Sequence, residues 1–116
     1  MNEALKQKLK ELSDSPGVYF HKNSSGEIIY VGKAAVLKNR VRQYFQNTLK
    51  DPKTTALVAE IFDTDWIQVD TEMDALFLES EMIKRYMPKW NILLRDDKTV
   101  SYVRISMNDT DRKSVV

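Results

Sequence analysis

Apolar residues recur at two different spacings along this chain of 116 residues. Near the amino terminus, leucines three and four residues apart predict a short helix over residues 3–12 with one apolar face. Residues 17–21 and 28–32 are instead rich in β-branched and aromatic side chains, and the polar segment between them is typical of a turn. Together these two segments predict a β-hairpin.

The middle of the chain continues with the same two patterns. Residues 36–45 carry apolar side chains on one helical face, and residues 54–62 predict a second short helix. Residues 65–70 are β-prone, so we expect a third strand there. The best-defined helix covers residues 71–87, because it begins at a threonine suited to an N-cap and ends before a proline.

The carboxyl-terminal part is less regular. After an apolar segment, residues 95–98 predict a turn and residues 102–105 favour one more strand. We expect a single domain over residues 1–107 with its core at 13–98, because a chain of this length has room for only one core. Residues 108–116 show no pattern and are expected to be a disordered tail or the start of a linker.

The hairpin turn sets a register that carries a chemical consequence. If the turn is centred between its two adjacent serines, Tyr19 faces Tyr30 and Gly17 faces Gly32. This register brings two phenols onto one face of the sheet as cross-strand neighbours. It also stacks two glycines at a point where another backbone or a ligand can approach closely.

Charge and cysteine content narrow the chemistry. With 18 Lys+Arg against 17 Asp+Glu the net charge is +1, so no global field favours nucleic acid, although charge can be segregated locally. The chain has no cysteine and His21 is its only histidine, which excludes disulfides, thiol catalysis and histidine-rich metal sites. Any metal must therefore bind oxygen ligands. The amino-terminal residues are charged and helix-prone, so we expect no membrane segment and a cytoplasmic location.

Glu79 is the most informative single residue. Its helical neighbours one turn away on either side are all apolar: Ala75, Leu76, Met82 and Ile83. A carboxylate in an apolar stripe must be neutralised, paired or bound to a metal. Mg²⁺ is the natural metal partner because it binds one or two carboxylates and keeps several waters. In the structural alternative, Glu79 pairs with Arg40 or a backbone N–H, or reaches solvent at the edge of the stripe.

Two tyrosines and a basic helix are further candidates. Tyr19 and Tyr30 either pack as an aromatic pair or supply a base, and a base requires a cation that lowers the phenol pKa from about 10. Lys33 and Arg40 are candidates for that cation, or they form an ordinary solvated face. The densest positive cluster in the chain lies on the helix at 36–45 and consists of Lys38, Arg40 and Arg42.

Taken together, these residues resemble the GIY-YIG nuclease family. Gly17-Val-Tyr19 and Tyr30-Val-Gly32 keep the family's two triplets with Val in place of Ile, and Lys33, Arg40, a helical Glu79 and Asn91 follow them. The resemblance extends over residues 11–98 through the segments SPGVY, IIYVGKA, LKNRVRQYF, DPKT and ALFLESEMIKRYMPKWNILLRDDK. The long segment over residues 71–98 is the most specific part of the resemblance, and it is similar to the nuclease domain of an excinuclease subunit of nucleotide excision repair. The chain departs from the family pattern after residue 98.

The resemblance implies a fold and an activity. The fold is α/β (α+β), with a small central antiparallel three-stranded sheet flanked by helices. The activity is that of a phosphodiesterase with a single divalent metal, Mg²⁺ or Mn²⁺, that incises one DNA strand 3′ to a lesion. Cutting is expected to follow DNA structure rather than base sequence.

The resemblance also assigns roles to residues. Glu79 holds the metal ion, Tyr30 acts as general base or as its hydrogen-bonded relay, and Tyr19 supports the attacking water. Arg40 and Lys33 face the phosphate, where a guanidinium can grip two oxygens at once. The remaining positions expected in the site or in contact with DNA are Gly32, Lys38, Arg42, Tyr44 and Asn91. Of these, Asn91 is expected to have a more structural role.

The expected partners are damaged double-stranded DNA and the other excinuclease subunits. The B subunit is expected to bind through parts of a longer parent chain, of which this chain is the amino-terminal part, and the isolated domain is expected to be a monomer. The low net charge indicates that affinity and lesion specificity lie in other domains or subunits. The alternatives are a stand-alone GIY-YIG structure-specific endonuclease, a catalytically inert module that binds nucleic acid or protein through residues 36–45, and a small α/β protein without a nucleic-acid role.

Overall fold

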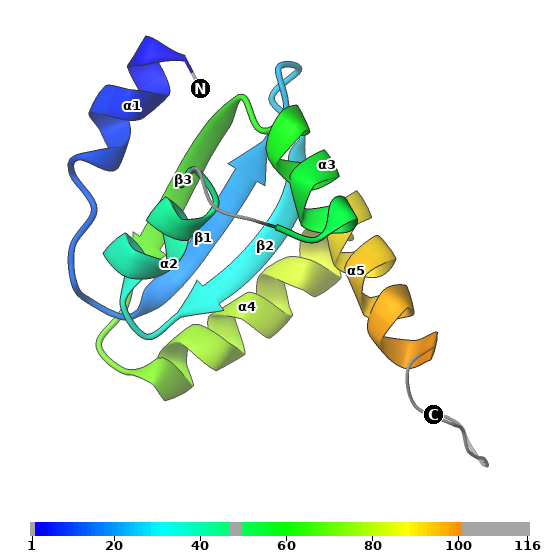
Figure 1. The fold of residues 1–116 in the computed structure, drawn as a ribbon. Coiled ribbons are helices and arrows are strands. Elements are labelled where there is room, and N and C mark those ends of the chain that lie inside the picture. Colours follow the sequence, from blue (N-terminus) through cyan, green and yellow to red (C-terminus); the bar gives the residue numbers. More distant parts are fainter. Residues whose placement is uncertain (1, 47–49, 101–116) are drawn as a thin grey trace.

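The centre of the fold is an antiparallel sheet of three strands. The structure is a computed structural model that describes residues 2–46 and 50–100. Its strands are β1 (Gly17–Lys22), β2 (Ile28–Ala34) and β3 (Asp63–Gln68). Their order is β2-β1-β3, so β3 pairs with the side of β1 that the hairpin leaves open (Figure 1). The prediction of an α+β fold with a three-stranded antiparallel sheet is therefore confirmed.

Helices surround this sheet on both faces (Figure 1). The four predicted helices are present with ends that differ by no more than one turn, and a further helix follows the last of them. The helices are α1 (Glu3–Leu9), α2 (Leu37–Gln43), α3 (Pro52–Glu60), α4 (Glu72–Tyr86) and α5 (Lys89–Val100).

One face of the sheet packs against α1 and α2. Leu5 and Leu9 from α1 and Leu37 and Val41 from α2 are buried in one cluster with the ring of Tyr19. The apolar face that the leucine spacing predicts for the first helix is thus the face that covers the sheet.

The opposite face packs against α4. Val18, Phe20 and Val31 point to this face, because side chains alternate along a strand, and they form a buried cluster with Ala75 of α4. The two faces of the sheet therefore have separate apolar layers, and the strands between them are covered on both sides.

α3 and α5 complete the fold at the start of β2. Leu57 of α3 and Trp90 of α5 pack together with Ile29 of β2 in a third buried cluster. β2 is the edge strand on this side, so α5 lies where a further strand could otherwise pair. Within residues 2–46 and 50–100, no helix is long and apolar enough to cross a membrane.

The boundaries of α4 follow the predicted signals. The side chain of Thr71 accepts a hydrogen bond from the backbone N–H of Asp74, as expected of an N-cap. At the other end Met87 has a left-handed backbone with φ of 43°, and Pro88 follows. The helix therefore ends where the proline predicts.

The hairpin register is two residues away from the prediction. Tyr19 faces Gly32 and His21 faces Tyr30, whereas the prediction paired Tyr19 with Tyr30. The prediction that Gly17 faces Gly32 is wrong for the same reason. The two tyrosines still share one face of the sheet, as diagonal rather than direct neighbours.

The turn explains this difference. The backbone N–H of Gly26 donates to the carbonyl of Asn23, and Gly26 has a φ of 83°, a conformation that only glycine adopts readily. The loop thus needs Gly26 as an additional residue beyond the two serines. A second irregularity between His21 and Lys22 shifts the register once more.

The predicted turn at 95–98 is wrong, because α5 continues through these residues to Val100. The segment contains neither glycine nor proline, and its arginine and lysine are good helix formers. Charge alone therefore misidentified a helical segment as a turn. The strand predicted at 102–105 and the tail at 108–116 lie outside the described residues.

Candidate active site

Three tyrosines meet on the face of the sheet that α2 covers. Tyr19 on β1 and Tyr30 on β2 have ring centroids 6.2 Å apart, and Tyr44, which follows α2, lies 5.7 Å and 6.4 Å from them. The hydroxyl oxygens of Tyr19 and Tyr44 are 2.8 Å apart and form a hydrogen bond. We call these three residues the tyrosine cluster.

Burial and neighbouring charges alter the acidity of this cluster. Burial raises the pKa of Tyr30, and the hydrogen bond and charge of Tyr44 and the carboxylate of Glu79 raise it further, while Arg40 lowers it. Burial also raises the pKa of Tyr19 well above its usual value. Both phenols are therefore protonated at neutral pH in the structure as it stands, and a base at Tyr30 requires additional positive charge.

Glu79 acts on this cluster from α4. It is half-buried and lies one turn after Ala75, which packs under Val31 of β2. The effect of its charge on the pKa of Tyr30 shows that the two groups interact. The apolar stripe around it is narrower than predicted, since Leu76 is 41% exposed. Glu79 therefore lies at the edge of the stripe, within reach of solvent.

The donor set around Glu79 fits a hard cation that keeps water ligands. The described residues contain no group of three or more histidine, cysteine, aspartate or glutamate side chains arranged to hold a metal. A cation at Glu79 would accordingly take most of its ligands from water or substrate, which is the coordination Mg²⁺ prefers.

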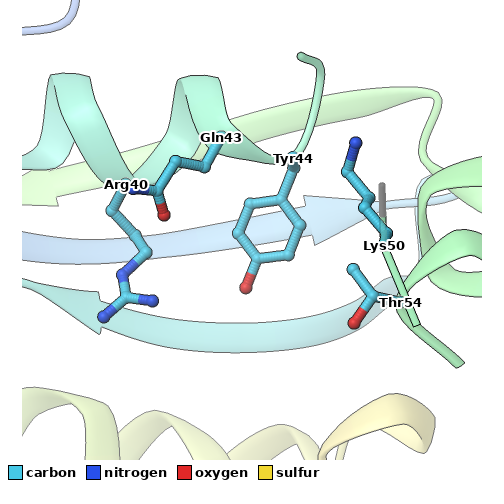
Figure 2. A pocket seen from close by; sticks show the side chains of 5 residues that line it. All are labelled: Arg40, Gln43, Tyr44, Lys50 and Thr54. Carbon is cyan, nitrogen blue, oxygen red and sulfur yellow. The ribbon is translucent and has the colours of Figure 1, made fainter. Parts of the chain in front are cut away.

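Arg40 lines an open cavity of about 250 Å³ beside the tyrosine cluster. The other lining residues are Gln43, Tyr44, Lys50 and Thr54. In Figure 2 the guanidinium of Arg40 and the hydroxyl of Tyr44 point toward β2, while the ammonium of Lys50 points the opposite way. Sequence reasoning missed Lys50 and Thr54 as residues of this cavity, although Thr54 belongs to the DPKT segment of the family resemblance.

Lys33 does not take the position expected beside Tyr30. It is three residues further along β2, so its side chain points to the opposite face, where α4 lies. The cation that lowers the pKa of Tyr30 is Arg40. Lys33 is exposed on the side of the sheet that faces Glu79, and a contact with phosphate stays a prediction.

Gly32 makes room for a side chain of the protein itself. A Cβ at this position would overlap the Cζ and hydroxyl of Tyr19 and lie 2.9 Å from its Cε2. The space on the Cβ side of Gly32 is therefore occupied by the Tyr19 ring, and an approach of the DNA backbone at Gly32 stays a prediction. The glycine is required because Tyr19 crosses directly over β2 to reach Tyr44.

Asn91 binds the backbone of β2, the kind of structural role expected of it, and a contact with substrate stays a prediction. Its Nδ2 donates to the carbonyl of Val31, and its Oδ1 accepts from the N–H of Val31, both at 2.8 Å. The side chain thus pairs with the open edge of β2 as a neighbouring strand would. It fixes the residue next to Tyr30, and its amide is occupied by this contact.

The predicted basic cluster on α2 is divided between two surfaces. Arg42 points away from Arg40 and lines a separate groove of about 310 Å³ with Lys6 of α1 and Lys10, which directly follows α1. Among the described residues none of these three groove cations has an ion-pair partner, whereas Lys8 on the same helix pairs with two aspartates of β3. We call the surface formed by Lys6, Lys10 and Arg42 the basic groove.

Lys38 belongs to neither the cavity nor the basic groove. It is half-buried, and its backbone N–H donates to the carbonyl of Ser13, which anchors the start of α2. Its assignment to the DNA surface stays a prediction.

A three-stranded antiparallel sheet that presents two tyrosines, with an arginine and a glutamate supplied by helices on its two faces, defines a GIY-YIG domain. The particular family follows from comparison with known proteins. Residues 15–92 match the model of the UvrC-like GIY-YIG domain, and the chain belongs to this family.

Curated relatives are longer proteins of the same kind. The chain is 54% identical over 106 residues to the UvrABC system protein C of Acetivibrio thermocellus and 52% identical over 106 residues to that of a Thermoanaerobacter species. In both comparisons the match covers 90% of this chain but 17% of the relative. The chain therefore spans about a sixth of the length of these relatives.

Solved structures match the fold. The GIY-YIG N-terminal endonuclease domain of UvrC from Thermotoga maritima, bound to its catalytic divalent cation magnesium, aligns with a TM-score of 0.68 and 37% identity, covering 78% of this chain and 98% of that one. A variant of the same domain with a tyrosine replaced by phenylalanine aligns with a TM-score of 0.68 and 36% identity and is also bound to the catalytic divalent cation.

Proposed function

We propose that the chain is a metal-dependent DNA endonuclease domain that hydrolyses one phosphodiester bond. The observation that carries the proposal is the convergence of Glu79, Arg40 and the tyrosine cluster at the edge strand β2, in a chain that belongs to the UvrC-like family. The finer proposal is incision of one strand 3′ to a lesion in nucleotide excision repair. It is supported by the names of the relatives.

Glu79 would hold a single divalent cation, Mg²⁺ or Mn²⁺. Support comes from its half-buried carboxylate at the edge of the apolar stripe and from the cation bound to the Thermotoga maritima domain. The bound cation would polarise the scissile phosphate and stabilise the leaving oxygen. A tyrosine variant of that domain also holds its cation, which is consistent with a carboxylate as the principal protein ligand.

Tyr30 would act as general base or as the relay to it. Its phenol loses a proton only when positive charge lies close by, because burial and Glu79 raise its pKa. Arg40 already lowers this pKa, and neutralisation of Glu79 would remove an opposing charge. The contact with Tyr44 raises the pKa of Tyr30 as well, so the positive charge that activates Tyr30 would come from Arg40 and the bound cation rather than from the tyrosine cluster itself.

Arg40 would bind the phosphate that is cleaved. Its guanidinium lines the open cavity next to Tyr44, where a bidentate contact can bind two nonbridging oxygens. Lys33 would contact the same DNA strand from the α4 side of the sheet, where its side chain is exposed. The two cations would then contact the DNA backbone from both sides of β2.

The basic groove would bind the flanking DNA backbone. Lys6, Lys10 and Arg42 lack ion-pair partners among the described residues, and the groove between them is open. Contacts of this kind position the duplex without reading its sequence. The groove adds local positive charge to a chain whose net charge is only +1.

The physiological substrate would be damaged double-stranded DNA, presented by the other subunits of a cytoplasmic excinuclease. The B subunit would bind through parts of the parent protein beyond this chain, since the chain spans about a sixth of its relatives. Residues 1–107 would form the single nuclease domain, which would be monomeric in isolation. Lesion recognition would accordingly lie outside this domain.

Incision of a duplex with one defined lesion tests the proposal. The parent protein, combined with the other excinuclease subunits and Mg²⁺, is compared with its Glu79→Gln variant, and we expect a loss of about two orders of magnitude or more, as is typical when an electrostatic group acting on the transition state is removed. Glu81, exposed two residues further along α4, is the matched control, and Glu81→Gln should incise at the wild-type rate.

Other outcomes of this experiment would identify the alternatives. Nicking by the chain alone, without partners or damage, would indicate a stand-alone endonuclease. DNA binding without incision by the wild-type protein, under all metal conditions, would indicate an inert binding module. Equal incision by wild type and Glu79→Gln would contradict the role of Glu79.

A further inference from the structure

The only histidine of the chain lies under the tyrosine cluster. His21 is fully buried on β1, where it faces Tyr30 on β2 and Thr64 on β3. Its ring centroid is 4.6 Å from that of Tyr44, 5.2 Å from that of Tyr19 and 6.2 Å from that of Tyr30. Every ring of the cluster therefore contacts this imidazole.

The two ring nitrogens of His21 have different surroundings. Nδ1 lies 2.9 Å from the hydroxyl oxygen of Thr64, which is itself fully buried. Nε2 is buried and has no hydrogen-bond partner within residues 2–46 and 50–100. Burial lowers the pKa of His21 to about 3, so the ring is neutral around pH 7. A buried polar atom without a partner costs free energy, so its presence at this position calls for an explanation.

Packing alone does not account for an imidazole at this position. An apolar side chain of similar size would fill the space without a polar atom to desolvate. What the imidazole adds is the hydrogen bond to Thr64, which fixes the rotation of the ring about its last side-chain bond. The fixed ring stacks on Tyr30 at an interplanar angle of 21° and meets Tyr44 at 74°. The hydrogen bond to Thr64 on β3 therefore fixes an imidazole that in turn packs against Tyr30 and Tyr44.

We propose that His21, held by Thr64, is a positioning residue that fixes the tyrosine cluster in the orientation in which the Tyr30 hydroxyl serves the active site. The catalytic part of this inference rests on the proposed function. The tautomer that the proposal predicts has the hydroxyl of Thr64 donating to Nδ1 and the proton on Nε2. The rings of the tyrosine cluster surround the imidazole, and an N–H directed at an aromatic face would be a favourable weak contact where a bare lone pair would not be.

Nitrogen NMR of the chain tests the tautomer directly. Because His21 is the only histidine, all imidazole signals belong to it. We expect the neutral ring with a protonated Nε2 throughout the pH range 5 to 9, following its low pKa of about 3. A ring that titrates near pH 6.5, the ordinary value for histidine, would show that the burial and the hydrogen bond to Thr64 are not maintained, and would overturn the proposal.

Thr64→Val removes the hydrogen bond while it preserves shape, and Thr64→Ser is the matched variant that keeps the hydroxyl. In the parent protein, we expect Thr64→Val to lower kcat for incision about tenfold, as for a slightly displaced catalytic group, with KM for DNA unchanged. Thr64→Ser should restore most of the rate. His21→Phe should lower kcat for incision by the same factor as Thr64→Val. The double variant, His21→Phe with Thr64→Val, should have a kcat no lower than that of either single variant.

The tyrosine ring signals of the chain separate this inference from the proposed function, since they require neither metal nor DNA. We expect the ring carbon signals of Tyr30 and Tyr44 to shift in Thr64→Val and to return in Thr64→Ser. Unchanged ring signals and a wild-type kcat in Thr64→Val would overturn the proposal. If the wild-type parent fails to incise, the proposed function fails, and the ring signals still decide whether His21 orients the cluster.

Discussion

Substitution of Gly32 by alanine tests whether this glycine accommodates Tyr19 or DNA. In the structure a Cβ at Gly32 would overlap the Cζ and hydroxyl of Tyr19 and lie 2.9 Å from Cε2. Tyr19 is 2% exposed, and its hydroxyl is bound to that of Tyr44, so the ring has no free direction in which to move. Alanine must therefore displace either the tyrosine or the strand.

The expected magnitude follows from overpacking of a filled core. Added carbons in such a place cost about 1–3 kcal/mol of the free energy of unfolding. Alanine in a strand otherwise gains roughly 0.5–1 kcal/mol over glycine. Tyr19→Leu removes the atoms that a new Cβ would overlap, because leucine ends before Cε2. In that background we expect Gly32→Ala to be neutral or stabilising, which gives a coupling of about 2 kcal/mol between the two positions.

Urea unfolding of the wild type, Gly32→Ala, Tyr19→Leu and the double variant measures this coupling. Binding of the same four proteins to a DNA duplex at low salt provides the comparison. A Gly32→Ala protein with wild-type stability but weakened DNA binding would refute the packing explanation and support the DNA contact predicted for Gly32 from the sequence. Equal destabilisation by Gly32→Ala in both backgrounds would also refute it.

Three further outcomes are expected. The pKa of His21 is about 3 in the folded protein and about 6.5 in the unfolded chain, so between these values the unfolded chain binds one more proton. The free energy of unfolding should therefore fall as the pH decreases below 6.5, by up to about 1.4 kcal/mol per pH unit. Acid titration followed by urea unfolding checks this, and His21→Phe should flatten the profile between pH 6.5 and 5. Asn91→Ala should lower the free energy of unfolding by about 2 kcal/mol in the same assay, from the two lost hydrogen bonds to Val31. Charge reversal of Lys6 and Lys10 should weaken DNA binding and reduce the slope of log affinity against log salt by about 2, while a charge reversal on the exposed side of α4 should not.

The sequence predicted the elements of this fold well because their signals are local. The spacing of the leucines in α1 and the N-cap at Thr71 depend on neighbouring residues, and the structure confirms both. The hairpin register depends on the conformation of the turn, where Gly26 adds one residue and a bulge beside His21 adds a further shift. Neither feature is visible in the alternation of the strands, so the predicted pairing of Tyr19 with Tyr30 was wrong.

The candidate site was predicted only as far as its residue types are distinctive. An isolated glutamate among apolar residues and a pair of tyrosines could be identified from the chain, whereas the amide of Asn91 bound to β2 could not. The orientation of Lys33 away from Tyr30 follows from strand alternation and could have been predicted. His21 gave no signal beyond being unique, because its importance depends on rings from β1, β2 and the end of α2 that only the fold brings together.

β2 is the element on which the proposed chemistry depends most. Tyr30 leaves this strand toward α2, Lys33 leaves it toward α4, and the residue between them that Asn91 binds, Val31, anchors the strand to α5. As an edge strand, β2 would otherwise have one row of unpaired backbone groups and greater freedom to move. In the proposed mechanism Tyr30 and Lys33 leave opposite faces of β2 to act at one phosphate. Their relative positions are maintained only if β2 does not move. The activity of the site therefore depends on α5, although α5 contributes no group to the proposed chemistry.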